Sequence, residues 1–156
     1  HDTPEFAVDC VEAWWRLDGR ARFPGADRLL LLADGGGSNG ARCRAWKYFL
    51  QHRLSSVHRV AVTVAHDPIG ASKWNPIEHR LFSDITKNWA AIPFDSYEAV
   101  LNYIATTKTS TGLRVQSTLV NKAYETGVRI SDKQMASLSV KSAPTLPRWN
   151  YTVQPA

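Results

Sequence analysis

The spacing of apolar residues changes from helical to continuous within the first third of the chain. Apolar positions recur every three or four residues after Thr3-Pro4, a helix cap followed by a proline in the first turn, and the pattern stops at Gly19. This spacing predicts a helix over that stretch. Its buried stripe is predicted to contain Phe6, Cys10, Trp14 and Leu17. The continuous apolar run at residues 29–33 predicts a strand that is covered on both faces.

Helical and extended patterns continue to alternate along the rest of the chain. They predict a helix at 41–54, a strand at 57–64, a helix beginning at 75–76, a helix at 96–106, a strand at 113–120, a short helix at 131–138 and an irregular tail with prolines. The inward side chains of the helix at 41–54 are predicted to be Cys43, Trp46, Phe49 and Leu50, and the mostly outward ones Arg42, Arg44, Lys47 and Arg53. The order of elements favours an α/β fold in which crossovers join parallel strands.

Composition and charge narrow the class of protein. The chain has 156 residues, 44% of them apolar and 21% charged, which is typical of one folded globular domain. No apolar segment approaches the roughly 20 residues that a membrane helix needs, and the two isolated cysteines fit a cytoplasmic protein. The net charge of +5 favours a polyanionic partner without requiring one.

A glycine-rich turn follows the predicted strand at 29–33. Gly35, Gly37 and Gly40 match the G-x-G-x-x-G spacing of a dinucleotide-binding loop. Two features disfavour that interpretation. Asp34 would repel a pyrophosphate, and the next acid, Asp67, follows Gly35 by 32 residues rather than about 20.

Asp34 therefore has two better interpretations. The glycines form a tight turn that Asp34 or Ser38 caps, or Asp34 is a ligand of a metal ion at the end of a strand.

Glu78 is the second carboxylate with a suggestive position. Asn75 and Pro76 predict a helix start, and Glu78 falls three residues after the cap, where it would complete a capping box. It would also lie in the first helical turn, from which its carboxylate could meet that of Asp34. Phosphoryl transfer with two divalent ions requires carboxylates that converge from separate elements.

Basic and aromatic residues surround Glu78. Lys73, Trp74, His79 and Arg80 combine cations with an aromatic ring, as nucleic-acid backbones and bases require. A core tryptophan and a solvated arginine are the structural alternatives. His66, next to an aspartate, could hold a metal or orient a phosphate, but a hydrogen-bonded loop histidine is the simpler expectation.

The segments LLADGGGSNG (31–40) and SKWNPIEHRLFSDITKNW (72–89) resemble the catalytic domain of ISAzo-type insertion-sequence transposases. The opening HDTPEFAV, the later TGLRV and WNYTV near the end are similar to the same family, so the resemblance covers nearly the whole chain. It implies a ribonuclease H-like (RNase H-like) layered sheet with flanking helices and a DDE metal site for DNA transposition and recombination.

The resemblance also implies roles for individual residues. Asp34 matches the second catalytic aspartate and Glu78 the catalytic glutamate, which would bind Mg²⁺ or Mn²⁺. From their charge and aromatic character, and not from the resemblance, the expected DNA-binding residues are Arg42, Arg44, Lys73, Trp74 and Arg80. The supporting residues would be Asn39, Asn75, His79 and His66. The partners would be the transposon ends and target DNA, with a homo-oligomer as the full-length form.

The family's first catalytic aspartate lies on the first strand of the fold, and no residue here matches it. We therefore expect the first strands to be missing from this chain and the chain to be inactive alone. The expected organisation is a partial catalytic domain over 1–112 and an extension over 113–156 that packs on it. The alternatives are a non-catalytic DNA-binding remnant and, with less support, a dinucleotide-binding domain that uses Gly35, Gly37 and Gly40.

Overall fold

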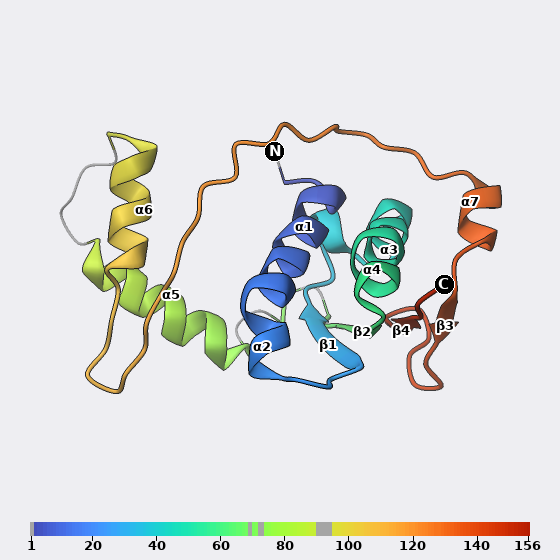
Figure 1. Cartoon of the computed structure of the whole chain (residues 1–156), viewed down its shortest axis with the longest axis horizontal. Helices are drawn as coiled ribbons and strands as arrows, with labels where there is room; N and C mark the ends of the chain where they lie inside the picture. The colour runs from blue at the N-terminus through green and yellow to red at the C-terminus, as the bar shows by residue number, and fades with distance from the viewer. Residues whose placement is uncertain (1, 69, 72–73, 90–94) are drawn as a thin grey trace. The chain divides into compact units, whose positions relative to one another are not determined.

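The computed structural model describes residues 2–68, 70–71, 74–89 and 95–156. These residues divide into two compact units (Figure 1). The first unit comprises residues 1–70 and 124–156, and the second comprises residues 71–123. The boundary predicted at residue 112 falls inside the second unit, and residues 124–156 pack with the beginning of the chain.

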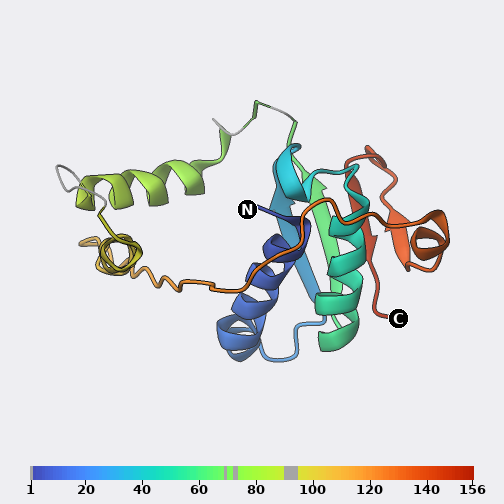
Figure 2. The same cartoon turned by 90° about the horizontal axis from the view of Figure 1, so that it is seen from above.

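The first unit is built on a mixed sheet of four strands in the order β1-β2-β4-β3 (Figure 2). The strands are β1 (Arg28–Ala33), β2 (Ala61–His66), β3 (Val140–Ser142) and β4 (Asn150–Val153). β1 and β2 are parallel, from Arg28 opposite Ala61 to Ala33 opposite His66. β4 is antiparallel to both β2 and β3. The predicted pair of parallel strands is confirmed.

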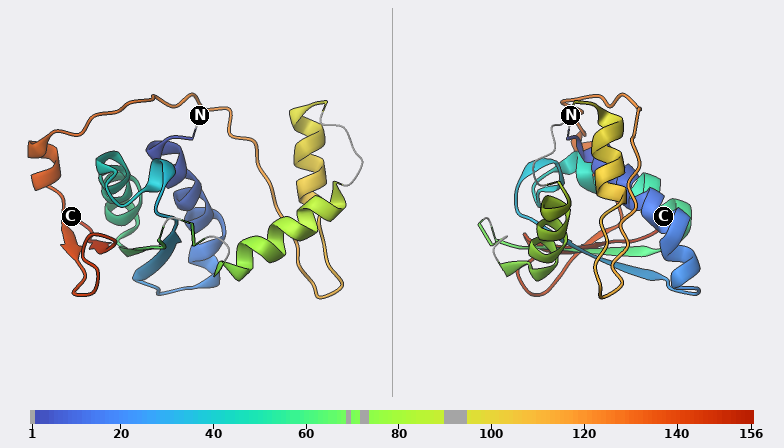
Figure 3. Two further views of the ribbon diagram at one scale, coloured as in Figure 1. Left: turned by 180° about the vertical axis from the view of Figure 1, so that it is seen from behind. Right: turned by 90° about the vertical axis from the view of Figure 1, so that its left-hand side faces the viewer.

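Two long helical segments lie on the same face of this sheet (Figure 3). The first consists of α1 (Pro4–Trp14), the π-helical turn η1 (Trp15–Gly19) and α2 (Arg20–Arg22). The second consists of α3 (Arg44–Phe49), the π-helical turn η3 (Leu50–Ser55) and α4 (Ser56–His58). In each wide turn a backbone N–H reaches five residues back, from Arg20 to the Trp15 carbonyl and from Ser56 to that of Gln51. The chain thus crosses from β1 to β2 through one helical segment.

The core lies between the helices and one face of the sheet. Partly buried and fully buried residues alternate along β2, and Val62 and Val64 are among the fully buried ones. Because β4 pairs with β2 in register, Tyr151 and Val153 join the same face. The rest of the core comes from Val8, Trp15, Ala33, Trp46, Leu50, Leu54 and Val60. The face of β1 that points away from these helices leaves Leu30 and Leu32 61% and 71% exposed.

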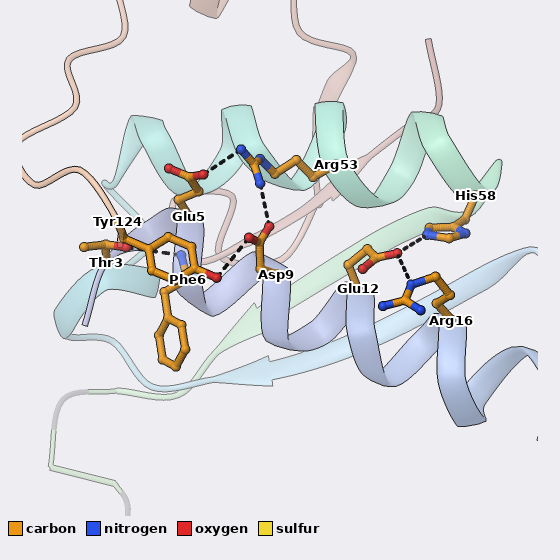
Figure 4. A network of polar contacts seen from close by, with 9 residues as sticks. All are labelled: Thr3, Glu5, Phe6, Asp9, Glu12, Arg16, Arg53, His58 and Tyr124. Atoms are coloured by element: carbon orange, nitrogen blue, oxygen red, sulfur yellow. Dashed lines mark hydrogen bonds and ion pairs between the residues drawn. The ribbon is translucent and has the colours of Figure 1, made fainter. Parts of the chain in front are cut away.

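Ion pairs and a hydrogen bond join α1 to η3, and we call this set of contacts the ionic clip (Figure 4). Arg53 on η3 contacts Glu5 at 2.6 Å and Asp9 at 2.8 Å, both on α1. The Tyr124 hydroxyl donates to the second oxygen of Asp9 at 3.0 Å, and the Tyr124 ring packs edge-on against Phe6. The carboxylates of Glu5 and Asp9 are mostly buried. The network therefore holds three chain segments together at one end of the helical layer.

The second unit contains α5 (Pro76–Asn88) and α6 (Tyr97–Ala105). Asn75 caps α5 by accepting from the Ile77 amide at 3.2 Å, and Ser96 caps α6 by accepting from Ala99 at 3.1 Å. The Asn88 side chain, at the end of α5, donates to the Tyr103 carbonyl on α6 at 2.6 Å. Both predicted helices are confirmed, as is Asn75 as the cap of the first.

Several predictions about the first helix and first strand are wrong. The helical segment continues through Gly19, the last residue of η1, to Arg22. The buried stripe contains Val8 and Trp15, whereas Trp14 is 39% and Leu17 71% exposed. The strand predicted at 29–33 exists, but it is not covered on both faces.

Later boundaries also differ from the predictions. The helix predicted at 41–54 extends to residue 58, and Arg59, in the left-handed region at φ 57°, ends it, so β2 starts only at residue 61. No strand forms at 113–120, where the pairing is a single bridge between Lys108 and Arg114. The short helix α7 (Asp132–Ala136) is confirmed, with Ser131 as its cap. The tail predicted to be irregular forms β3 and β4.

The ionic clip predicts a measurable loss of stability when Arg53 is replaced. Arg53→Gln leaves two largely buried carboxylates without their cation, and we expect the free energy of unfolding to fall by about 1–3 kcal/mol. The matched control is Arg22→Gln, which removes an exposed ion pair with Asp18 and should change stability by less than about 0.5 kcal/mol. Urea titration of both variants tests this, and equal effects would contradict the role of the clip.

Candidate functional site at the carboxyl ends of β1 and β2

Asp34 is the first residue after β1, and its side chain is exposed. The neighbouring parallel strand ends one residue before Asp67, whose amide donates to the Ala33 carbonyl at 2.8 Å. Two carboxylates therefore follow adjacent strand ends on the same edge of the sheet. In open α/β sheets, ligands bind outside the carboxyl ends of parallel strands.

The glycine turn after Asp34 is held by its own side chains. The Asn39 amide, oriented to satisfy its neighbours, donates to Asp34 Oδ1 at 3.0 Å and to the Gly36 carbonyl at 2.8 Å. Ser38 Oγ donates to Asp2 Oδ1 at 2.7 Å. Gly37 has φ +67°, in the left-handed region that favours glycine. Asp34 thus takes part in the turn, as the structural interpretation predicted, while its second oxygen has no partner among the hydrogen bonds of the described residues.

The turn does not lead directly into a helix. A short 3₁₀ turn, η2 (Gly37–Asn39), comes first, and α3 begins only at Arg44. A dinucleotide site of the G-x-G-x-x-G type needs the glycines to open the helix whose N-terminus receives the pyrophosphate. This geometry gives the dinucleotide alternative no support.

His66, the last residue of β2, connects this turn to the C-terminal strand. Its ring is buried between two carbonyl oxygens, with Nδ1 at 2.8 Å from Trp149 O and Nε2 at 2.8 Å from Asn39 O. Only ring nitrogens that carry hydrogen can donate, so a neutral ring makes one of these bonds and the imidazolium makes both. The expectation of a hydrogen-bonded histidine is confirmed, and both ring nitrogens are engaged by the backbone instead of facing a metal.

A cavity of about 770 Å³ opens beside the glycine turn. Its walls are the glycine turn, the start of α3 and the loop before β4. The lining residues are Gly35, Gly36, Gly37, Gly40, Ala41, Arg42, Cys43, Arg44, Lys47, Met135, Pro147, Arg148 and Trp149. Four of these are cations and none is an acid. The cavity is therefore electropositive and directly adjoins the residue that follows Asp34.

The cations of the cavity differ in their surroundings. Arg44 bonds to Asp132 at 2.6 Å and to the Ile130 carbonyl, so its charge is neutralised locally. The Lys47 ammonium lies 4.6 Å from the centre of the Tyr151 ring, and burial lowers the pKa of Lys47. Burial likewise raises the pKa of Tyr151, whose phenol is in the core beside Trp46. Arg42 and Arg148 are exposed, without an ion pair among the described residues.

The predicted residues of the second unit are described only in part. Glu78 lies in the first turn of α5, but its side chain is outside the described residues, as is Lys73 altogether. Trp74 is 75% exposed, so it is not a core tryptophan of its unit. His79 and Arg80 are exposed and line a hollow of about 450 Å³ together with Asp84 and Lys87.

Sequence reasoning missed three residues of the cavity: Lys47, Arg148 and Trp149. Lys47 was expected on the outer face of its helix, but the C-terminal hairpin covers that face with Tyr151. Arg148 and Trp149 lie in the tail that was expected to be irregular. The period-two pattern of residues 150–153 is too short to predict a strand that would bring them here.

The fold and site define a mixed α/β domain with carboxylates at adjacent strand ends beside a cationic cavity. The described residues contain no cluster of three or more potential metal ligands, and none of their helices is long and apolar enough to cross a membrane. A family model described as "Rhodopirellula transposase DDE domain" matches residues 1–155. The chain belongs to this family of DDE transposase domains. Neither the curated proteins nor the solved structures contain a match.

The bridge made by His66 predicts that its loss weakens the glycine turn. His66→Leu removes the ring contacts with the Asn39 and Trp149 carbonyls and leaves the Asn39 carbonyl without its donor, so the free energy of unfolding should fall by about 1–3 kcal/mol. His52→Leu, at an exposed ring that packs on Tyr48, is the control and should cost less than about 0.5 kcal/mol. Hydrogen exchange would locate the effect, and unchanged protection at residues 36–40 would argue against the bridge.

Proposed function

We propose that this chain is an RNase H-like catalytic domain of a DNA transposase and that Asp34 is one of its metal ligands. The observation that carries the proposal is the position of Asp34. It is an exposed carboxylate at the carboxyl end of a parallel strand, in a family of DDE domains whose chemistry is the cleavage and transfer of DNA strands. Glu78, in the first turn of α5, is the proposed second ligand.

The free edge of β1 supports the RNase H-like part of the proposal. β1 pairs with β2 on one side, and on its other side it has no strand partner among the described residues. Further strands of a larger sheet would pair along this edge, and the first catalytic aspartate would then lie next to Asp34. The exposed Leu30 and Leu32 are suited to a layer that covers this face. The partial catalytic domain at 1–112 and the extension at 113–156 remain a prediction.

The chemistry of the proposed ligands suits magnesium or manganese. Carboxylate oxygens are the hard ligands that these ions prefer. Bound ions would activate a water or a DNA 3′-hydroxyl and stabilise the oxygen that leaves phosphorus. Asn39 holds Asp34 Oδ1 by a hydrogen bond and so fixes the carboxylate with its other oxygen outward. His66 in turn holds the Asn39 backbone. Both are positioning residues, and His79 and Asn75 are proposed to act similarly at the start of α5.

The positive charge supports DNA as the partner. Arg42 is exposed beside the glycine turn, where a phosphate could approach it. Lys73, Trp74 and Arg80 are proposed to contact DNA at the start of α5. Arg44 is a weaker candidate, because Asp132 already neutralises it. We further propose that the protein acts as a homo-oligomer in the cytoplasm, as joining two transposon ends to a target would require.

A non-catalytic DNA-binding role is the second candidate. The specific observation in its favour is that the cationic cavity forms within the first unit, without any contribution from Glu78. This candidate predicts DNA binding that weakens steeply with salt and that does not depend on a divalent ion. Metal binding at Asp34 distinguishes the two candidates.

Manganese binding to the chain tests the role of Asp34. We expect Asp34→Asn to weaken Mn²⁺ binding roughly tenfold or more, because it removes a ligand charge. The matched control is Asp67→Asn, at the other exposed carboxylate of the same sheet edge, and it should leave the affinity within about twofold. Water-proton relaxation measures the bound Mn²⁺. If Asp34→Asn binds Mn²⁺ as the parent does, the assignment of this ligand is wrong.

Strand cleavage tests the proposed pair of carboxylates. In the transposase that supplies the first aspartate, Asp34→Asn and Glu78→Gln should each abolish Mg²⁺-dependent nicking of DNA, while both variants still bind DNA. Asp84→Asn, a carboxylate later on the same helix, is the control for Glu78 and should keep the activity. Nicking that survives either catalytic substitution would refute the pair.

A further inference from the structure

The electropositive cavity beside the glycine turn suggests a more specific ligand than DNA in general. Its volume of about 770 Å³ falls within the range of small-molecule sites. A DNA duplex is too wide to enter a site of this size. Among nucleic-acid ligands, a free nucleotide and one nucleotide of an unpaired strand are therefore the two to compare.

The walls of the cavity combine the three components that bind such a nucleotide. Arg42 and Arg148 are exposed cations without an ion pair among the described residues, so they are available to phosphate oxygens. The backbone of the glycine turn forms one side without side chains, which permits close approach. Trp149 adds an aromatic residue of the kind on which bases stack.

Lys47 provides a reason for the cavity to prefer an anion. Its ammonium is half-buried against Tyr151 and has no carboxylate partner among the described residues. Burial lowers the pKa of Lys47, which means that the charged form is poorly solvated. A phosphate in the cavity would stabilise that charged form. Binding should consequently weaken as the pH rises through the pKa of Lys47.

Gly36 shows that the wall is open on the side of the glycine turn. An added Cβ at this position would meet no protein atom within 4 Å, and its backbone, at φ −119° and ψ −178°, suits any residue. Folding therefore does not require glycine here. A ligand that passes close to the backbone would require it.

We propose that this cavity seats one nucleotide of an unpaired DNA strand, with its phosphate between Arg42, Lys47 and Arg148. The inference rests on the proposed function for the identity of the polymer as DNA. The strand is favoured over a free nucleotide because the cavity is open and because the turn lacks the helix start that holds a dinucleotide pyrophosphate. The cavity would hold the strand beside the bond that is cut.

Binding of a fluorescent twelve-residue oligothymidylate to the chain, in EDTA, tests this proposal. Arg42→Ala and Arg148→Ala should each weaken binding about fivefold or more, and each should lower the salt dependence by roughly one phosphate contact. Gly36→Leu should weaken it several-fold without lowering the melting temperature. Arg20→Ala, an exposed cation on α2 away from the cavity, is the control and should stay within twofold. Melting curves establish that each variant is folded.

Three results would overturn the proposal. The first is unchanged binding in both Arg42→Ala and Arg148→Ala. The second is tighter binding of a duplex of the same length than of the unpaired strand. The third is displacement of the strand by AMP or NAD⁺ at the concentration at which the strand itself competes, which would identify a free nucleotide as the ligand.

The Asp34→Asn variant separates this proposal from the proposed function. We expect it to keep strand binding in EDTA, because the cavity does not use the carboxylate, while it loses Mn²⁺. If it keeps Mn²⁺ and the cavity variants lose the strand, the metal assignment fails and the nucleotide site stands. If it loses Mn²⁺ and the cavity variants bind the strand normally, the metal assignment stands and the nucleotide site fails.

Discussion

The in-register parallel pairing of β1 with β2 is the constraint on which the rest of the first unit depends. It places Ala33 opposite His66, so the residues after both strands emerge at one edge. Val62 and Val64 on β2 alternate inward against α1 and α3, and a shift of one residue would turn these valines to the other face. The buried core thus determines the register, and the register determines where Asp34 lies.

The polar contacts around the site extend outward from that edge. Asn39 orients Asp34, His66 holds the backbone of Asn39, and the same ring contacts the Trp149 carbonyl, directly before β4. The C-terminal hairpin, far away in the sequence, is therefore part of the support of the glycine turn. It also covers Lys47 with Tyr151 and contributes Arg148 to the cavity. The carboxylate and the cationic cavity share one scaffold, so a ligand bound in the cavity would lie on the same edge of the sheet as Asp34, the proposed metal ligand.

Local signals in the sequence predicted the features that local physics controls. Helix starts at Thr3, Asn75, Ser96 and Ser131 were predictable because a capping side chain and its helix are neighbours in the chain. The part that Asp34 takes in the glycine turn was also predictable, because the carboxylate and the turn are neighbours in the chain, whereas its role as a metal ligand stays a prediction. The proposal that Asp34 and Glu78 act as a pair comes from resemblance to a family, since their 44-residue separation carries no information about distance.

Features that depend on distant contacts were not predictable. The strands β3 and β4 have three and four residues, and the pairing of β4 with β2, more than 80 residues away in the sequence, supplies the stability that their own pattern lacks. β3 pairs in turn with β4. Lys47 was expected in solvent because no local sequence pattern predicts the C-terminal hairpin that covers it. The buried stripe of the first helix was assigned wrongly because Trp14 and Trp15 are equally apolar, and only the packing against Val8 and the sheet selects Trp15.

The two wide turns, η1 and η3, have a consequence for how the length of this domain can vary. Each five-residue hydrogen bond accommodates one residue more than ordinary α-helical winding uses. Deleting one residue elsewhere in either helix would rotate everything beyond it by about 100° and misdirect the core side chains. Deleting it within Trp15–Gly19 or Leu50–Ser55 would convert the wide turn to regular winding and leave both flanks facing as before. Related sequences that differ by a single-residue gap in these helices should carry the gap at those two turns.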